Sequence, residues 1–406
     1  MDSQNTLPTI LALIPLFLGI LGRVAQIPFA ALKSIGLVVI VVLAILSATT
    51  FDLDLTISFL AFVVLLSGFC AMLCQDETQQ ASVISSSSMI ALGLALGVLF
   101  SQGMASRLFL SGLLSFGAFS FYCQKQGSLK STLTLTHFGV AIVLSLISAF
   151  GGMKIFAGLF LAATFLPLVP FHLPFVGTVG SAKGTLSSFW VVVWLVMGLA
   201  ELNMIHSSLA SMLSVLSLLA LFSALYASLA TLGQRQSNLF VASAVVAHVS
   251  LIWGLLSVFP KFPEWGIGFG VAVAFVLGGI CLAFSFVQQH YGWQIIGKLP
   301  GLGEPMPRFG SAMGFLVSFA MFLPFFPAIT GLPIMPIVPT NDVGLIKIFI
   351  MFLAVWLVGG WYLLQAFHQT AFGMARTDVT YNDLRATEYA AVWMLLLGAT
   401  YSGLIY

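Results

Sequence analysis

Long apolar runs follow one another along the whole chain, each bounded by charged residues, proline or clusters of glycine. Each run holds about 20 residues, the length that an α-helix needs to cross a hydrocarbon layer of about 30 Å. We therefore predict fourteen spans, near residues 6–22, 33–50, 55–75, 82–102, 107–123, 133–152, 154–173, 185–205, 208–233, 238–258, 265–288, 311–331, 343–370 and 387–405. The short connections leave almost nothing for a soluble domain.

The composition agrees with this pattern. Charged residues make up 6% of the 406 positions and the residues AVILMFWYC 60%, whereas about a quarter of a typical soluble domain is charged. The chain is therefore predicted to be an all-α polytopic membrane protein. Its net charge of +2 gives no sign of nucleic-acid binding. Function is best sought at the few polar residues inside the spans.

The basic residues predict an orientation, because Lys and Arg in short loops stay on the cytoplasmic side. Ten of the fourteen fall in odd-numbered connections: Arg23, Lys33, Lys125, Lys130, Lys183, Arg235, Lys298, Arg308, Arg376 and Arg385. Arg107, Lys154, Lys261 and Lys347 lie on the even side or at span edges. Both termini are therefore expected outside. The first run lacks a basic flank and a small-residue cleavage site, so we expect it to be a retained span.

Two spans contain prolines that must break or kink a helix, because proline lacks the backbone donor and clashes with the preceding turn. The seventh span carries Pro167 and Pro170. The twelfth carries Pro324 and Pro327, followed by Pro333. Broken helices five spans apart are typical of a duplicated five-helix unit with an ion or substrate path. Chance repetition of proline-rich runs is the alternative.

Four motifs, in this order, resemble one known family. Pro167-Leu168-Val169-Pro170-Phe171-His172 resembles a Pro-x-x-Pro-[Phe/Leu]-His run on a broken seventh helix. Ala242-Ser243-Ala244-Val245-Val246-Ala247-His248-Val249 resembles an Ala-Tyr-Ser-Ser-Val-Ser-His-Met run on a tenth helix. Gly331-Leu332-Pro333 and Ala371-Phe372-Gly373 resemble the break of a twelfth helix and the end of a thirteenth. Over about residues 100–405 the chain thus resembles antiporter-like membrane subunits of respiratory complex I, multi-subunit cation/proton antiporters and membrane-bound hydrogenases.

The resemblance implies an antiporter-like fold with inverted five-helix repeats and broken helices seven and twelve, in one membrane domain, 1–406. Helices one to four would occupy 1–102, the first repeat region 107–258, and the second repeat region with the C-terminal helix 265–405. Other integral membrane subunits and lipids are the implied partners, in a bacterial inner membrane or an organelle inner membrane. We expect no catalytic site, cofactor, metal or nucleic acid. The whole complex could be an NADH:quinone oxidoreductase-like or other ion-translocating assembly.

The family moves protons along buried ionisable groups: a Glu on helix five, Lys on helices seven and eight, and Lys or Glu on helix twelve. A nearby carboxylate restores the proton affinity that a lysine loses on burial. Here the matching positions are neutral, at about Ser111, Phe165, Val193 and Asn341. Asp342, next to Asn341, would restore a carboxylate after a shift of one residue.

The remaining polar candidates have both structural and functional interpretations. His248 is a proton relay or a hydrogen-bonded packing residue. Lys347 extends to the outer face or pairs with Asp342, and His172 caps freed backbone groups or carries protons. We interpret Glu201 and His206, and likewise Gln365, His368 and Gln369, as solvated helix ends. Cys70, Cys74, Cys123 and Cys281 are interpreted as small buried hydrophobes.

Three functions remain open at this stage. The favoured one is an antiporter-like subunit of a larger complex, structural or weakly conducting, because the charges of the family's proton path are missing. The second is an active proton or cation transporter that uses His248, Asp342 and Lys347. The third is an unrelated permease with proline-broken helices.

Overall fold

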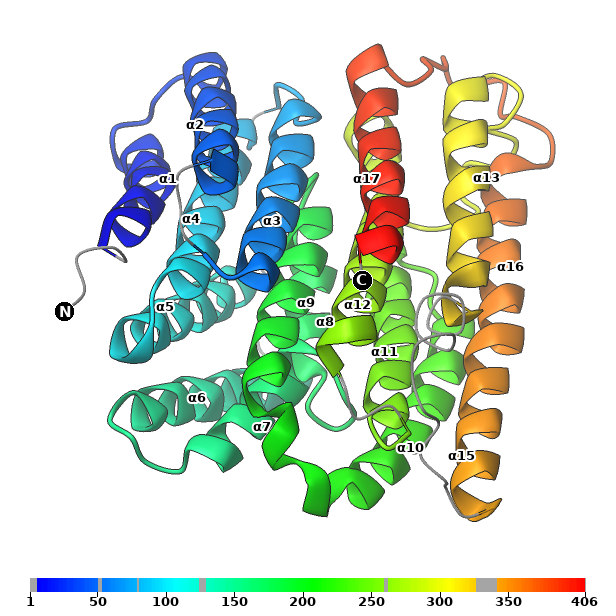
Figure 1. Ribbon diagram of the computed structural model, residues 1–406. Coiled ribbons are helices and arrows are strands. Elements are labelled where there is room, and N and C mark those ends of the chain that lie inside the picture. The colour runs from blue at the N-terminus through cyan, green and yellow to red at the C-terminus, as the bar shows by residue number, and fades with distance from the viewer. Residues whose placement is uncertain are drawn as a thin grey trace. The chain divides into compact units, whose positions relative to one another are not determined.

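The computed structural model describes residues 6–49, 53–78, 80–123, 129–258, 262–325 and 342–405, and almost all of them are helical (Figure 1). Within these ranges the extended pairing is limited to one isolated antiparallel bridge, between Gln236 and Ile295. The predicted all-α class is therefore confirmed. Asn341, Pro327 and Pro333 lie outside the described residues, as does the side chain of Asp342.

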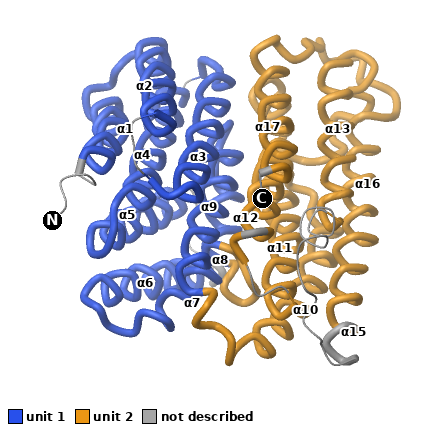
Figure 2. Tube along the Cα trace, viewed as in Figure 1, with its two compact units in different colours: residues 1–165, 173–205 blue, residues 166–172, 206–406 orange. Residues whose placement is uncertain are grey.

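The chain divides into two compact units (Figure 2). Residues 1–165 and 173–205 form unit 1, and residues 166–172 and 206–406 form unit 2. The segment Leu166–His172, which links two helices of unit 1, therefore packs with unit 2. Each unit has its own buried apolar core.

Unit 1 begins with helices α1 to α4 and continues with α5 to α9. Their bounds are α1 Thr6–Val24, α2 Phe29–Thr49, α3 Leu55–Leu73, α4 Ala81–Phe100, α5 Gly103–Tyr122, α6 Leu129–Ala149, α7 Lys154–Phe165, α8 Leu173–Ser181 and α9 Leu186–Ile205. Helix α4 packs on α1, α3, α5 and α9 and is almost entirely buried. Helix α9 also packs on α3, α7 and α8, so these two helices form the centre of the unit.

Unit 2 is built around α12. Its helices are α10 Leu213–Leu232, α11 Ser237–Leu255, α12 Phe262–Tyr291, α13 Pro307–Phe322, α15 Asp342–Leu353, α16 Gly359–Ala371 and α17 Ala386–Ile405. A π-helical turn, Ala354–Val358, joins α15 to α16. Helix α12 packs on α11, α13 and α17, and it is buried from Trp265 to Val287.

Within the described residues, twelve helices, some extended by short turns, are long and apolar enough to cross a membrane. They correspond to twelve of the fourteen predicted spans. The seventh predicted span, 154–173, contains the short apolar helix α7 and the break after it, and α8 begins at its last residue, Leu173. The last contains α17. The chain is therefore an integral membrane protein whose helices follow the predicted order.

Close backbone contact fixes α1 against α4. A Cβ atom added to Gly93 of α4 would lie 2.5 Å from the backbone nitrogen of Leu16. A Cβ atom on Gly19 of α1 would lie 2.7 Å from the carbonyl oxygen of Ser86. Small residues at such crossings allow helices to pack closely in lipid, where no hydrophobic effect drives helices together.

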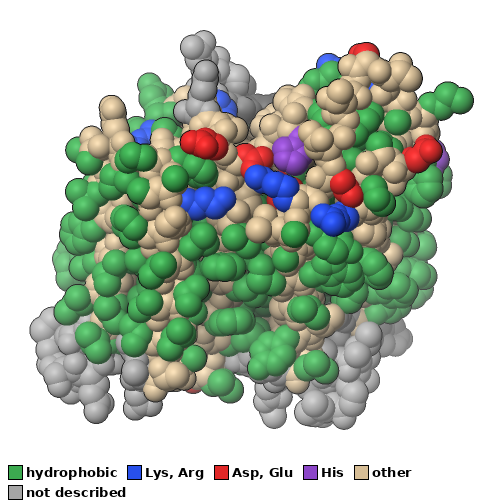
Figure 3. Space-filling view, turned by 90° about the horizontal axis from the view of Figure 1, so that it is seen from above, with side chains coloured by type: hydrophobic (Ala, Val, Ile, Leu, Met, Phe, Trp, Pro, Cys, Tyr) green, Lys and Arg blue, Asp and Glu red, His purple; other side chains and the backbone are tan. Residues whose placement is uncertain are grey.

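Charged and histidine side chains gather on one face of the molecule, viewed in Figure 3. In unit 2, the end of α12 and the start of α17 carry His290 and Glu388, which lie 3.5 Å apart. Hydrophobic side chains are exposed on the flanks, as expected for helices in contact with lipid.

Candidate functional site: a broken helix beside an apolar axis

The prolines of the seventh predicted span lie where its helix is interrupted. Helix α7 ends at Phe165 and α8 begins at Leu173, with Pro167 and Pro170 between them. The Val169–Pro170 peptide is cis. An interrupted helix frees backbone groups that must find new partners inside a membrane.

Side chains of unit 2 supply those partners. The indole Nε1 of Trp253 on α11 donates to the carbonyl oxygen of Leu166 at 3.1 Å. The backbone N–H of Val169 donates to the hydroxyl oxygen of Ser223 on α10 at 3.2 Å. Ser250 on α11 donates in turn to Ser223 at 2.8 Å. Protein side chains therefore satisfy one carbonyl and one N–H group within the break.

His172 ends the break. Its half-buried ring lies edge-on to Tyr226 of α10, with the ring centroids 5.8 Å apart. The predicted capping and proton-carrying roles of His172 both stay predictions.

In unit 1, apolar side chains occupy the positions where the family would carry charge. Phe165 packs on Trp194 of α9 with ring centroids 4.7 Å apart, and both rings are buried. Val193 is also fully buried. The Ser111 hydroxyl on α5 donates to the carbonyl oxygen of Leu108, 2.8 Å away in its own helix.

Further rings close this region, which we call the aromatic axis: Phe138, Phe165, Phe175, Trp190 and Trp194. Phe138 and Phe175 each meet Trp194 edge-on, with ring centroids 6.1 Å apart. The Nε1 groups of Trp190 and Trp194 are buried, and neither has a hydrogen-bond partner in the described part of the chain. Apart from these two indole N–H groups, the rings of the aromatic axis are apolar.

Unit 1 also contains a pair of oppositely charged side chains, which lies outside the aromatic axis. Arg107, in the first turn of α5, donates through Nη1 to both carboxylate oxygens of Glu201 near the end of α9, at 2.7 Å. Glu201 is 1% exposed and Arg107 17%. The prediction that Glu201 is a solvated helix end is therefore wrong, because its carboxylate is buried against a guanidinium. This pair was not predictable from the sequence, because its members are 94 residues apart.

In unit 2, His248 lies inside α11 and is 1% exposed. Its Nδ1 is 2.8 Å from the carbonyl oxygen of Ala244. A carbonyl oxygen can only accept, so Nδ1 carries a proton. His248 is therefore held by a carbonyl group one turn earlier in its own helix.

The second predicted break is described in part. Helix α13 ends at Phe322, and Pro324 is buried in the 3-10 turn Leu323–Phe325 that follows. Lys347 lies half-buried on α15. The proposed pairing of Lys347 with Asp342 stays a prediction.

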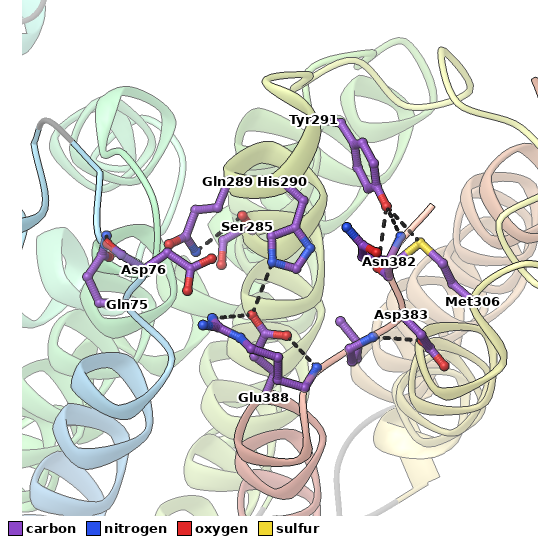
Figure 4. Close-up of polar contacts among 12 residues, drawn as sticks. Gln75, Asp76, Ser285, Gln289, His290, Tyr291, Met306, Asn382, Asp383 and Glu388 are labelled. Atoms are coloured by element: carbon purple, nitrogen blue, oxygen red, sulfur yellow. Dashed lines mark hydrogen bonds and ion pairs between the residues drawn. The ribbon is translucent and has the colours of Figure 1, made fainter. Parts of the chain in front are cut away.

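A polar junction at the charged face joins α12, α13 and α17 (Figure 4). The Glu388 carboxylate accepts from the backbone N–H and the guanidinium of Arg385, at 2.8 and 2.9 Å, and His290 Nε2 lies 3.5 Å from it. Asp383 accepts from the backbone N–H groups of Arg308 and Phe309, at 3.0 and 3.2 Å. The two hydrogen bonds to Asp383 cap the N-terminus of α13.

The cysteine interpretation needs one correction. Cys70, Cys74 and Cys281 are free and buried, as expected. Cys123 is exposed, because it follows the last residue of α5.

The sequence matches no family model, and no curated protein matches it. Solved structures do share its fold. A chain of respiratory complex I from Thermus thermophilus superposes with a TM-score of 0.72 at 18% identity, covering 96% of this chain and 94% of that one. The chain has the antiporter-like fold.

Two further complexes contain chains with this antiporter-like fold. One is an archaeal membrane-bound sulfane sulfur reductase, with a TM-score of 0.69, 14% identity, and coverage of 96% of this chain and 74% of that one. The other is the Mrp complex from Dietzia sp. DQ12-45-1b, with a TM-score of 0.65, 14% identity, and coverage of 92% and 82%. At these identities the likeness establishes the fold, while function rests on the residues of this chain.

Proposed function

We propose that this chain is a structural, at most weakly proton-conducting, antiporter-like subunit of a larger energy-converting membrane complex. Its contribution is to pack against sister membrane subunits and to seal the membrane arm. The proposed setting is a bacterial or organelle inner membrane with both termini outside, and the proposed repeat regions are 107–258 and 265–405.

The contact between Phe165 and Trp194 is the observation that carries this proposal. A proton path through a membrane needs titratable groups or water along its length. At the positions of Phe165 and Val193 the chain has apolar side chains packed without exposure. A buried phenyl ring can neither bind a proton nor organise a water chain.

Similarity in fold supports other membrane subunits as the partners of this chain. Respiratory complex I, the sulfane sulfur reductase and the Mrp complex are all assemblies that contain chains of this fold. Exposed apolar residues on α1 and α2, such as Phe17, Val38 and Ile45, are suited to contact lipid or other membrane subunits.

The alternative is an active proton or cation transporter that uses His248, Asp342 and Lys347. One observation favours it: His248 is a buried histidine inside a membrane-length helix, and such residues are often functional. Its hydrogen bond to the carbonyl oxygen of Ala244 suits a packing role equally well.

Proton flux distinguishes the two functions. The chain, or the complex purified with it, is reconstituted in liposomes and an imposed pH gradient is followed with an entrapped dye. His248→Ala, Asp342→Asn and Lys347→Met are compared with the unaltered protein. Unchanged proton flux in all three variants would exclude the transporter function. A large loss in any variant that still folds contradicts the structural role, as does purification from native membranes without any partner subunit.

A further inference from the structure

Unit 2 contains a cavity of about 760 Å³ that the function proposed above does not use. It lies at one end of the helices, between the end of α10, the loop to α11, residues 295–300 and the second half of α16. Its volume is in the range of small-molecule sites. All of its lining residues belong to unit 2.

The lining is basic and rich in hydrogen-bond donors. Arg235, Lys298 and His368 contribute positive or protonatable groups, and Gln365 and Gln369 contribute amides. Among the described residues around the cavity there is no Asp or Glu. This composition favours an anion, and a guanidinium with an ammonium is a usual partner of phosphate oxygens.

The main chain and a ring hold the basic residues in place. The backbone N–H of Ile296 donates to the carbonyl oxygen of Arg235 at 2.8 Å, next to the bridge between Gln236 and Ile295. The Lys298 ammonium lies 4.6 Å from the centre of the Trp293 ring. Arg235 and Lys298 therefore lie in two segments that are joined by backbone hydrogen bonds.

Tyr362 is an independent sign that the cavity accepts a ligand. It lines the cavity from α16 and is 1% exposed. Within the described residues its buried hydroxyl has no hydrogen-bond partner. An unsatisfied buried hydroxyl is costly, and an acceptor oxygen of a bound ligand would satisfy it.

The surroundings of the cavity indicate which anion it takes. Leu232 and Phe372 line it and are also exposed, and exposed apolar side chains continue along the same helices at Leu229 of α10 and at Trp361 and Leu364 of α16. A free anion would gain nothing from this apolar surface, whereas lipid chains would bury it. The predicted orientation also places the cavity on the cytoplasmic side, where anionic lipids attract basic pockets between helices.

We propose that this cavity binds the phosphate headgroup of an anionic phospholipid. Arg235, Lys298 and His368 contact the phosphate, Tyr362 donates to its deepest oxygen, and the acyl chains lie along the exposed apolar faces of α10 and α16.

Binding of short-chain lipids to the purified full-length chain in detergent tests the proposal. The ligands are dioctanoyl phosphatidylglycerol, dioctanoyl phosphatidylcholine and inorganic phosphate. We expect phosphatidylglycerol to bind at least tenfold more tightly than either of the others. Arg235→Gln and Lys298→Gln should each weaken its binding about fivefold, the share of one basic residue at a membrane surface. Lys298→Arg should restore binding, and Lys154→Gln, at an exposed lysine of unit 1, should leave it unchanged.

Tyr362→Phe separates ligand binding from folding. It should weaken binding of phosphatidylglycerol without lowering the unfolding temperature of the lipid-free protein, because the lost hydroxyl has no protein partner. Equal affinity for phosphatidylglycerol and phosphatidylcholine, or unchanged binding in the two Gln variants, would overturn the proposal. Inorganic phosphate binding as tightly as phosphatidylglycerol would assign the cavity to a free anion. Crosslinking of Lys298 to a partner subunit in native membranes would assign it to a protein contact.

Discussion

One guanidinium nitrogen of Arg107 lies 2.7 Å from both carboxylate oxygens of Glu201, in the interior of unit 1. Arg107 lies near the start of α5 and Glu201 near the end of α9. Their mutual contact compensates for the burial of both charges.

Removing one member of this pair should be much more harmful than removing both. Arg107→Leu leaves an unpaired buried carboxylate, and we expect a loss of about 3 kcal/mol in the free energy of unfolding. The double variant Arg107→Leu/Glu201→Leu should recover most of that loss. Thermal unfolding in detergent measures both. Additive losses in the double variant would show that the two side chains do not stabilise each other.

The aromatic axis should respond to the loss of a ring as a close-packed core does. Phe165→Ala removes the ring that packs on Trp194 and should cost about 3 to 5 kcal/mol. Phe165→Leu, which keeps most of the volume, should cost clearly less. Chemical denaturation in mixed micelles gives both values. If alanine and leucine had equal, small effects, the region would have to be loosely packed.

The crossing of α1 and α4 should not tolerate a methyl group. Gly93→Ala places a Cβ atom against the backbone of Leu16, which cannot move without shifting α1. We expect a loss of about 1 to 3 kcal/mol, as for overpacked cores. Gly139→Ala on α6 is the matched control, because its Cβ atom would meet open space. Alanine at that helical position should be neutral or stabilising, so equal losses in the two variants would contradict the close crossing.

Loss of the Asp383 cap should weaken the start of α13 without unfolding the rest of the protein. Asp383→Ala removes the acceptor for the backbone N–H groups of Arg308 and Phe309, at a cost of about 1 kcal/mol. Asp383→Asn keeps one acceptor oxygen and should retain part of the cap. Hydrogen exchange at these two amides is the direct measurement. Unchanged exchange in the alanine variant would mean that other groups protect them.

Asp378 should titrate below its usual range. The side-chain hydrogen bond from Arg376, 2.9 Å between Nε and Oδ1, lowers the pKa of this exposed carboxyl from the usual 3.8. The contact is complete above that value and is lost as the pH falls through the lowered pKa. Arg376→Gln should bring the pKa back toward the usual value in an NMR titration. High salt should do so in part, because the pair is exposed.

The spans were predictable because one rule, the thickness of the membrane, sets the length of every apolar run. The first break was predictable because Pro167 and Pro170 cannot continue a helix. The partner of Glu201 was not, since Arg107 and Glu201 each look like an ordinary helix end and only packing brings them together. The same holds for Arg235, Lys298 and His368, which come from three segments and form one cavity wall.

The way the break after α7 is closed has an electrical consequence. A charge crossing a membrane gains about 2.3 kcal/mol for each 100 mV of potential. A water-filled gap in a membrane-spanning helix would therefore let ions leak across. Here the indole of Trp253 and the hydroxyl of Ser223 hydrogen-bond directly to backbone groups of the break. In the structural role proposed above, the chain would keep this break in its backbone and still insulate an energised membrane.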